Sequence, residues 1–135
     1  MYRLLYVSTK SPELTKLETD KIVKISEVNN GALEISGILM EFKQHFIQYI
    51  EGPSVNLYKL FKKIKEDTRH CDVSLIYYKP LEERLYSKWG MSFYTIDLLE
   101  KGQSLLDKLE DLIQLGSGNT EKEVADLLSN LDSQN

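Results

Sequence analysis

The sequence predicts an α+β fold in which two helices cover one face of an antiparallel sheet. Three observations predict it. Strand and helix patterns follow one another as β-α-β-β-α-β-β through residues 1–98, polar or Pro/Gly breaks separate them, and residues 105–131 repeat leucine at helical spacing. This order is typical of a ferredoxin-like sheet with two helices on one face. We therefore expect one such domain at residues 1–98 and a helical extension with two C-terminal helices at residues 99–135.

The first half of the domain begins with a strand at residues 2–8, where apolar side chains occupy both alternating faces. The following helix has two candidate starts: the serine and proline of Ser11-Pro12-Glu13, or the capping box Thr15-Lys16-Leu17-Glu18. Asn29-Asn30-Gly31 is expected to end it. Five apolar residues mark a roughly helical apolar stripe along it: Leu14, Leu17, Ile22, Ile25 and Val28.

Residues 35–51 predict two strands joined by a turn near Lys43-Gln44, and Gly52-Pro53 breaks the second strand. A helix is expected at residues 54–66, with its lysines on the solvent-exposed face. Further strands are predicted at residues 73–78, closed by Lys79-Pro80, and at residues 91–98. Two leucine-rich stretches separated by residues 116–119 predict the C-terminal helices, and Thr120 opens a capping box for the second.

Composition places the chain among soluble globular proteins. It has 135 residues, of which 41% are hydrophobic and 28% charged, and no apolar run approaches the length that spans a bilayer. The single cysteine, Cys71, excludes an internal disulfide and suits a reducing cytoplasm. The net charge of −4 argues against a general grip on nucleic acid. We expect a cytoplasmic protein with neither a membrane nor a nucleic-acid partner.

Two polar residues stand out within apolar strand patterns. Gln48 lies among Phe46, Ile47, Tyr49 and Ile50. A buried carboxamide needs hydrogen-bond partners, and glutamine has two donors and two acceptor lone pairs to offer. Tyr6 occupies the same kind of strand position. Common nucleotide, zinc and hydrolase motifs are missing, so the pattern alone predicts only a ferredoxin-like domain with a core tyrosine and an edge glutamine.

Six ordered segments carry a more specific signal. They are Tyr2-Arg3-Leu4-Leu5-Tyr6-Val7-Ser8, Asn29-Asn30, Ile35-Ser36-Gly37-Ile38-Leu39, Phe46-Ile47-Gln48-Tyr49-Ile50-Glu51-Gly52, Asp67-Thr68-Arg69-His70 and Trp89-Gly90-Met91. In this order and spacing they resemble the BLUF family, the sensors of blue light using flavin. The resemblance covers residues 1 to about 98.

The resemblance implies a bound flavin, FAD with FMN as the alternative. Tyr6 matches the phenol that gives an electron and a proton to the excited flavin, and Gln48 matches the carboxamide between that phenol and the N5/O4 edge of the ring. Trp89 and Met91 match a pair near the last strand that relays the change. No catalytic residue and no metal site is expected.

The resemblance also implies residues that hold the flavin. Asn30 matches the asparagine at the ring's carbonyl and N3 side, with Asn29 beside it, and Ile22 and Ile35 match aliphatic residues flanking the ring. Three residues match positions near the ribityl chain, the phosphate and the ring end: Asp67, Arg69 and His70. Arginine is well suited to phosphate.

Two positions depart from the family pattern. Glu34 stands where glycine is common, which implies either a turn without positive φ or one that tolerates strain. Ser36 replaces the usual threonine and keeps the hydroxyl.

The expected function is therefore a blue-light photoreceptor and not an enzyme, because residues 99–135 are too few for a cyclase or phosphodiesterase domain. Its output is expected through contacts with a protein partner or within a homo-oligomer. The alternatives are a ferredoxin-like regulatory module without photochemistry and an acylphosphatase-like hydrolase that depends on Arg3 or Asn30. RNA binding through sheet aromatics lacks its motif and the net charge.

Overall fold

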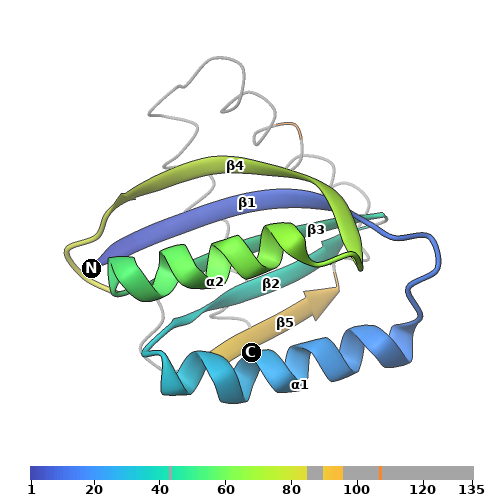
Figure 1. Cartoon of the computed structure of the whole chain (residues 1–135), viewed down its shortest axis with the longest axis horizontal. Coiled ribbons are helices and arrows are strands. Elements are labelled where there is room, and N and C mark those ends of the chain that lie inside the picture. Colours follow the sequence, from blue (N-terminus) through green and yellow to red (C-terminus); the bar gives the residue numbers. More distant parts are fainter. Residues whose placement is uncertain (43, 85–89, 96–106, 108–135) are drawn as a thin grey trace. The chain divides into compact units, whose positions relative to one another are not determined.

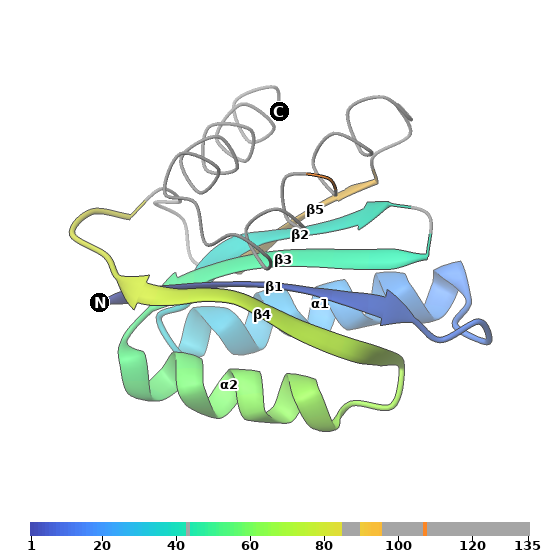
Figure 2. The same cartoon turned by 90° about the horizontal axis from the view of Figure 1, so that it is seen from above.

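The computed structural model describes residues 1–42, 44–84, 90–95 and 107. A five-stranded sheet has the order β4-β1-β3-β2-β5, and β1 pairs antiparallel with both β3 and β4. The strands are β1 (Tyr2–Lys10), β2 (Ser36–Phe42), β3 (His45–Gly52), β4 (His70–Pro80) and β5 (Gly90–Thr95). Helices α1 (Lys16–Ala32) and α2 (Ser54–Glu66) lie on the same face of the sheet (Figures 1 and 2). This confirms the predicted fold class.

Helix α1 begins at the capping box. The Thr15 hydroxyl accepts a hydrogen bond from the Glu18 N–H at 3.2 Å and donates to the Glu18 carboxylate at 3.0 Å. The serine and proline of the other candidate start form a turn instead, in which the Leu14 N–H bonds to the Ser11 carbonyl. The helix also continues past the predicted stop to Ala32, so the Asn29-Asn30-Gly31 stretch lies inside it.

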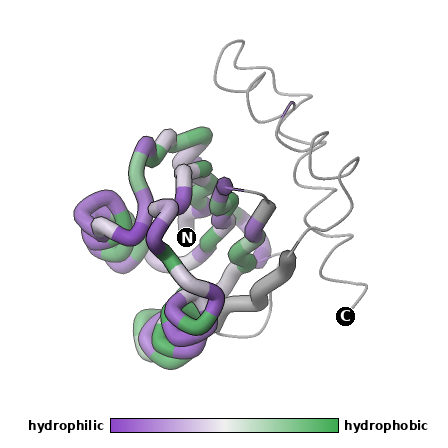
Figure 3. The backbone as a smooth tube through the Cα atoms, turned by 90° about the vertical axis from the view of Figure 1, so that its right-hand side faces the viewer, coloured by the Kyte–Doolittle hydropathy of each residue, from purple (hydrophilic) through white to green (hydrophobic). Residues whose placement is uncertain are grey.

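Three residues of the apolar stripe of α1 are largely exposed, although one of them, Ile25, lines the cavity described below. Leu17, Ile25 and Val28 are 66%, 58% and 74% exposed, whereas Thr19, Val23 and Asn30 are buried. The helix turns a partly polar face inward because that face borders this cavity and not only the aliphatic core. Figure 3 shows hydrophobic and hydrophilic segments alternating along both helices.

The strands and the second helix largely match their predicted bounds. Helix α2 spans residues 54–66 as predicted, and the paired strands β2 and β3 confirm the turn between them. Strand β4 is longer than the predicted residues 73–78 and includes Pro80; because β4 is an outer strand, a proline at its end removes no interior ladder bond. Strand β5 runs from residue 90 to 95; residues 96–98 and, apart from Asp107, both predicted C-terminal helices lie outside the described residues.

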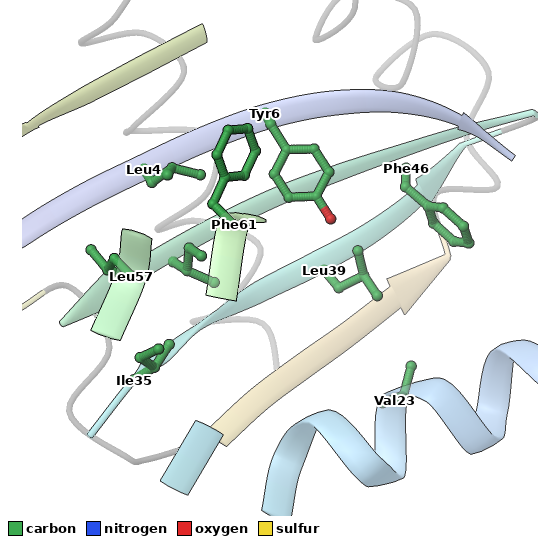
Figure 4. Packing of buried hydrophobic residues seen from close by; sticks show 9 residues of the cluster. Leu4, Tyr6, Val23, Ile35, Leu39, Phe46, Leu57 and Phe61 are labelled. Carbon is green, nitrogen blue, oxygen red and sulfur yellow. The ribbon is translucent and has the colours of Figure 1, made fainter. Parts of the chain in front are cut away.

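The core between the sheet and the helices joins residues from every one of these layers. Figure 4 shows Leu4 and Tyr6 of β1, Leu39 of β2, Ile35 just before β2, and Leu57 and Phe61 of α2, which belong to one buried cluster. The opposite face of the sheet also carries buried side chains, among them Leu5, Ile47 and Tyr49. Strand β1 is thus buried on both faces, as its sequence predicts. In the part of the chain that the structure describes, no helix combines the length and apolar character that crossing a membrane requires.

Glu34 adopts a left-handed conformation with φ of 58°, so of the two possibilities the turn is the one that tolerates strain. We expect Glu34→Gly to raise the free energy of unfolding by about 0.5–1 kcal/mol. The left-handed conformation costs an ordinary residue about 1–2 kcal/mol, and the greater entropy of unfolded glycine offsets part of the gain. Urea denaturation measures the change. Asp72→Gly, at φ of 52°, should gain less because aspartate enters this region more readily. A Glu34→Gly variant less stable than the parent would contradict the explanation.

Candidate functional site

A cavity of about 220 Å³ lies among α1, α2 and the sheet. Its walls come from both helices, from the four neighbouring strands β4, β1, β3 and β2, and from the turn after α2. The lining residues are Tyr6, Thr19, Ile22, Ile25, Ser26, Asn29, Asn30, Leu39, Phe46, Gln48, Leu60, Lys63, Ile64, Asp67, Arg69 and His70. A mainly apolar pocket with a few converging polar groups is typical of a small-molecule or cofactor site.

Tyr6 and Gln48 meet at the wall of this cavity. The Tyr6 hydroxyl donates to Gln48 Oε1 at 2.5 Å, and both side chains are buried. The two residues are direct cross-strand partners in the β1–β3 ladder, so the register itself brings them together. Figure 4 shows the Tyr6 ring beside Phe61; the two ring centroids are 5.7 Å apart. The contact between strand positions 42 residues apart is a product of the fold.

Burial keeps the Tyr6 phenol protonated. Loss of solvent raises the pKa of Tyr6 well above its ordinary value near 10, and the negative charge of Asp67 raises it further. The phenol is therefore a hydrogen-bond donor at neutral pH, which matches its bond to the Gln48 oxygen. Removing an electron from such a group makes it strongly acidic, so its proton can pass along the bond that already exists.

Asn30 presents a polar group that the described residues leave unsatisfied. Its side chain is 2% exposed, it lines the cavity, and its Nδ2 has no hydrogen-bond partner among the residues that the structure describes. A buried amide without a partner costs on the order of 1–3 kcal/mol. An acceptor on a molecule within the cavity would remove that cost. The carbonyl oxygens of a flavin ring are acceptors of this kind, so the residues present fit a flavin.

The rim of the cavity carries an ion pair. Arg69 Nε donates to both carboxylate oxygens of Asp67, at 2.8 and 3.0 Å, and Arg69 Nη2 also bonds to Asp67. The hydrogen bonds from Arg69 hold the pKa of the Asp67 carboxyl below its usual range. Because the Arg69 side chain is 47% exposed, this pair adds little to stability. Its importance is local: it fixes one positive and one negative group in the wall of the cavity that Tyr6 and Gln48 also line.

His70 connects three elements of the site. One ring nitrogen, Nε2, lies 2.6 Å from the Ile64 carbonyl at the end of α2, and the other, Nδ1, lies 2.8 Å from the Ser8 hydroxyl on β1. A carbonyl can only accept, so Nε2 carries a proton. Both nitrogens are thus engaged within the protein. His70 borders the cavity, and its ring forms part of the wall.

Of the other predicted site residues, two line the cavity and three are not placed there by the described structure. Ile22 and Asn29 line the cavity, whereas Ile35 is fully buried in the core and is not one of the lining residues. The backbone of Met91 lies in β5 and its side chain is not described; Trp89 lies outside the described residues. Their suggested roles stay predictions.

Sequence reasoning missed several lining residues, although a signal was available. Thr19 and Ser26, which were not predicted, share one face of α1 at helical spacing with the predicted Asn30, and this polar stripe borders the cavity. On α2, Leu60 and Ile64 stand four residues apart and line the opposite wall. A search for a polar stripe on the inner face of a helix would have found the first set.

Comparison with known proteins relates this fold and site to light sensing. The family model BLUF, sensors of blue-light using FAD, matches residues 1–92. Photoactivated adenylate cyclase subunit beta of Euglena gracilis is 31% identical over 110 residues, which are 81% of this chain and 13% of that protein. The blue light- and temperature-regulated antirepressor BluF of Escherichia coli is 26% identical over 83% of this chain and 28% of its own length. The chain therefore spans only a small part of these curated relatives.

Solved structures give the same result. The dark-state structure of BlrB, a BLUF protein, superposes with a TM-score of 0.72 at 26% identity, covering 96% of this chain and 92% of BlrB. A structure of BlrP1 from Klebsiella pneumoniae with FMN and cyclic diGMP gives a TM-score of 0.71 at 25% identity, covering 93% of this chain and 34% of BlrP1. With the family model matching residues 1–92, this chain belongs to the BLUF family of blue-light sensors using FAD.

Proposed function

We propose that this chain holds a flavin in the cavity between α1 and α2 and responds to blue light by rearranging the hydrogen bond between Tyr6 and Gln48. That buried bond at the cavity wall is the observation that carries the proposal. A bound flavin supplies absorption of blue light and a site that accepts an electron. The remaining chemistry belongs to side chains of the protein.

Tyr6 and Gln48 form the responsive pair. Tyr6 supplies the electron, and its proton moves toward Gln48 Oε1, to which it is already bonded. Gln48 is neutral, so it can turn or tautomerise without creating a buried charge, and it offers either oxygen or nitrogen to its neighbours. Trp89 and Met91 are proposed to relay the change, on the resemblance alone.

The residues around this pair hold the ring and its substituents. Asn30 donates its amide to a ring carbonyl, and Ile22 packs against the ring from α1 with Asn29 nearby. A role for Ile35 at the ring rests on the resemblance alone. Asp67, Arg69 and His70 meet the ribityl and phosphate end. We propose FAD as the natural flavin, following the family description, with FMN as the alternative.

We further propose that the chain is a sensor that passes its signal on by protein contact instead of catalysing a reaction itself. Residues 1–98 form the sensing domain, and residues 99–135 carry the output to a partner protein or within a homo-oligomer. Its single exposed cysteine, Cys71, suits a reducing, cytoplasmic setting. An acylphosphatase-like site has less support, because Arg3 stacks on Tyr77 on the face of the sheet opposite the Asn30 cavity.

Absorption spectra of the purified chain test this proposal. Loaded with FAD, the protein should show a small red shift of the flavin bands after blue light, and the shift should reverse in the dark. Loading with FMN in parallel, and competition between the two flavins, identifies the preferred cofactor. A protein that binds flavin and shows no shift would rule out the photochemistry. A colourless protein that takes up neither flavin would favour the regulatory-module alternative.

A further inference from the structure

We propose that Tyr49, Ser36 and Arg84 are positioning residues that stabilise the dark arrangement of Gln48 from the opposite face of the sheet. They converge on Glu51, and the four residues are called the Glu51 network below. The inference rests on the proposed light response, because it concerns how long the rearranged state lasts.

Glu51 is a buried carboxylate whose two oxygens both accept hydrogen bonds. Its side chain is 0% exposed; the Ser36 hydroxyl donates to Oε1 at 3.2 Å and the Tyr49 hydroxyl donates to Oε2 at 2.8 Å. Burial and the neighbouring Glu51 charge raise the pKa of Tyr49, so its hydroxyl remains a donor. A buried carboxylate is tolerated only where such partners are fixed, so these contacts hold their strands in place.

Arg84 closes the network from the segment that follows β4. Its Nη1 donates to the Ser36 hydroxyl at 2.9 Å and to the Glu51 backbone carbonyl at 3.3 Å, and its Nη2 donates to the Glu34 carbonyl at 2.7 Å. One guanidinium thus joins the approach to β2, the start of β2 and the end of β3. Lysine cannot reproduce this planar fork.

The network shares a strand with the photoactive pair. Side chains alternate along β3, so Gln48 faces the cavity while Tyr49 and Glu51 face the other way. The ladder pairs Ser36 with Glu51 and Leu39 with Gln48. The two backbones are tightly apposed between these rungs: a Cβ atom on Gly37 would lie 2.0 Å from the Tyr49 carbonyl oxygen. The Tyr49–Ile50 peptide therefore lies tightly against β2, and the Tyr49 hydroxyl is bonded to Glu51 on the face away from the cavity. Both contacts restrain Tyr49, the residue that follows Gln48 on β3.

This restraint favours one arrangement of Gln48. The network is complete in the state in which Gln48 Oε1 accepts from Tyr6, so its bonds stabilise that state. When Gln48 rearranges and its backbone shifts, the neighbouring Tyr49 shifts too, which strains the hydrogen bond between the Tyr49 hydroxyl and Glu51. Weakening the network lowers the advantage of the dark state, and the return from the light state becomes slower.

The test is the rate of dark recovery in the flavin-loaded chain after a blue-light pulse. Tyr49→Phe removes one hydroxyl on the face away from the cavity, and recovery should slow by about threefold to tenfold, the effect of one lost hydrogen bond on a rate. Tyr78→Phe is the matched control: it also loses one hydroxyl bond, to the Ser54 carbonyl, on a strand that does not adjoin β3, and its recovery should equal that of the parent.

Variants at Ser36 and Arg84 separate positioning from general stability. Ser36→Ala should slow recovery as Tyr49→Phe does, whereas Ser36→Thr keeps the hydroxyl and should recover at the parent rate. Arg84→Lys should also recover slowly with its dark spectrum unchanged. Unchanged or faster recovery in both Tyr49→Phe and Ser36→Ala, in a parent that shows the red shift, overturns the network and leaves the proposed function intact. A flavin-loaded parent protein that shows no red shift would contradict both the proposed function and the role of the Glu51 network.

Discussion

Replacing Tyr6 by phenylalanine is expected to abolish the light-induced red shift while the protein still binds flavin. The substitution keeps the ring that packs beside Phe61 and removes only the hydroxyl that donates to Gln48 Oε1. Without that group the pair has neither the proton to move nor the hydrogen bond to rearrange. The free energy of unfolding should fall by about 1–3 kcal/mol, because the buried Gln48 oxygen loses its donor. Difference spectra before and after blue light measure the first effect, and urea denaturation the second.

Tyr2→Phe is the control for this experiment. Tyr2 is on the same strand and stacks on Tyr78 with ring centroids 4.8 Å apart, and it is not among the residues lining the cavity. Loss of the Tyr2 hydroxyl should leave the red shift unchanged. A full-size, reversible shift in Tyr6→Phe would show that the response arises from another group.

Gly37→Ala is expected to be the most destabilising small substitution in the sheet. Its Cβ would lie 2.0 Å from the Tyr49 carbonyl oxygen and 2.9 Å from the Ile50 Cα, and both obstacles are backbone atoms that cannot swing aside. Strands β2 and β3 must separate where Gly37 pairs with Ile50, two rungs from Gln48. We expect a loss of about 3 kcal/mol or more in the free energy of unfolding, and weaker flavin retention.

Gly52→Ala provides a graded comparison. Its Cβ would lie 2.9 Å from the Glu34 carbonyl oxygen, a milder conflict at the end of β3. It should therefore cost less than Gly37→Ala when both are measured by urea denaturation. Equal stability of Gly37→Ala and the parent would mean that the strands can spread without penalty.

Local patterns were sufficient to predict most elements of the fold. The capping box at Thr15, the turn between β2 and β3 and the bounds of α2 each depend on residues close in sequence. The inner face of α1 could not be read in the same way. Leu17 and Val28 point outward because the inward face includes Thr19 and Asn30 at the cavity, and an apolar-stripe rule assigns such polar residues to solvent.

In the site, too, some features follow from local sequence and others depend on the folded structure. Sequence placed Tyr6 and Gln48 on strands, but their contact depends on the β1–β3 register, a property of the folded sheet. The early start of β4 depends on distant partners too, since His70 contacts Ser8 and Ile64. Arg84 carried no local signal, because a single arginine beyond a strand has no periodic pattern, and only its three acceptors reveal its role.

Strand β4 has a consequence for how copies of this chain can associate. It is an outer strand of the sheet, and such strands invite edge-to-edge pairing with another molecule. Here the left-handed Asp72 lies near one end, Lys79 and Pro80 end the other, and its pairing with β1 shifts register twice along the way. Proline, lysine and irregular backbone are the features by which natural sheets avoid aggregation at an edge. A homo-oligomer of this protein should therefore form through side-chain contacts, and β4 should not serve as a seam that joins two sheets into one.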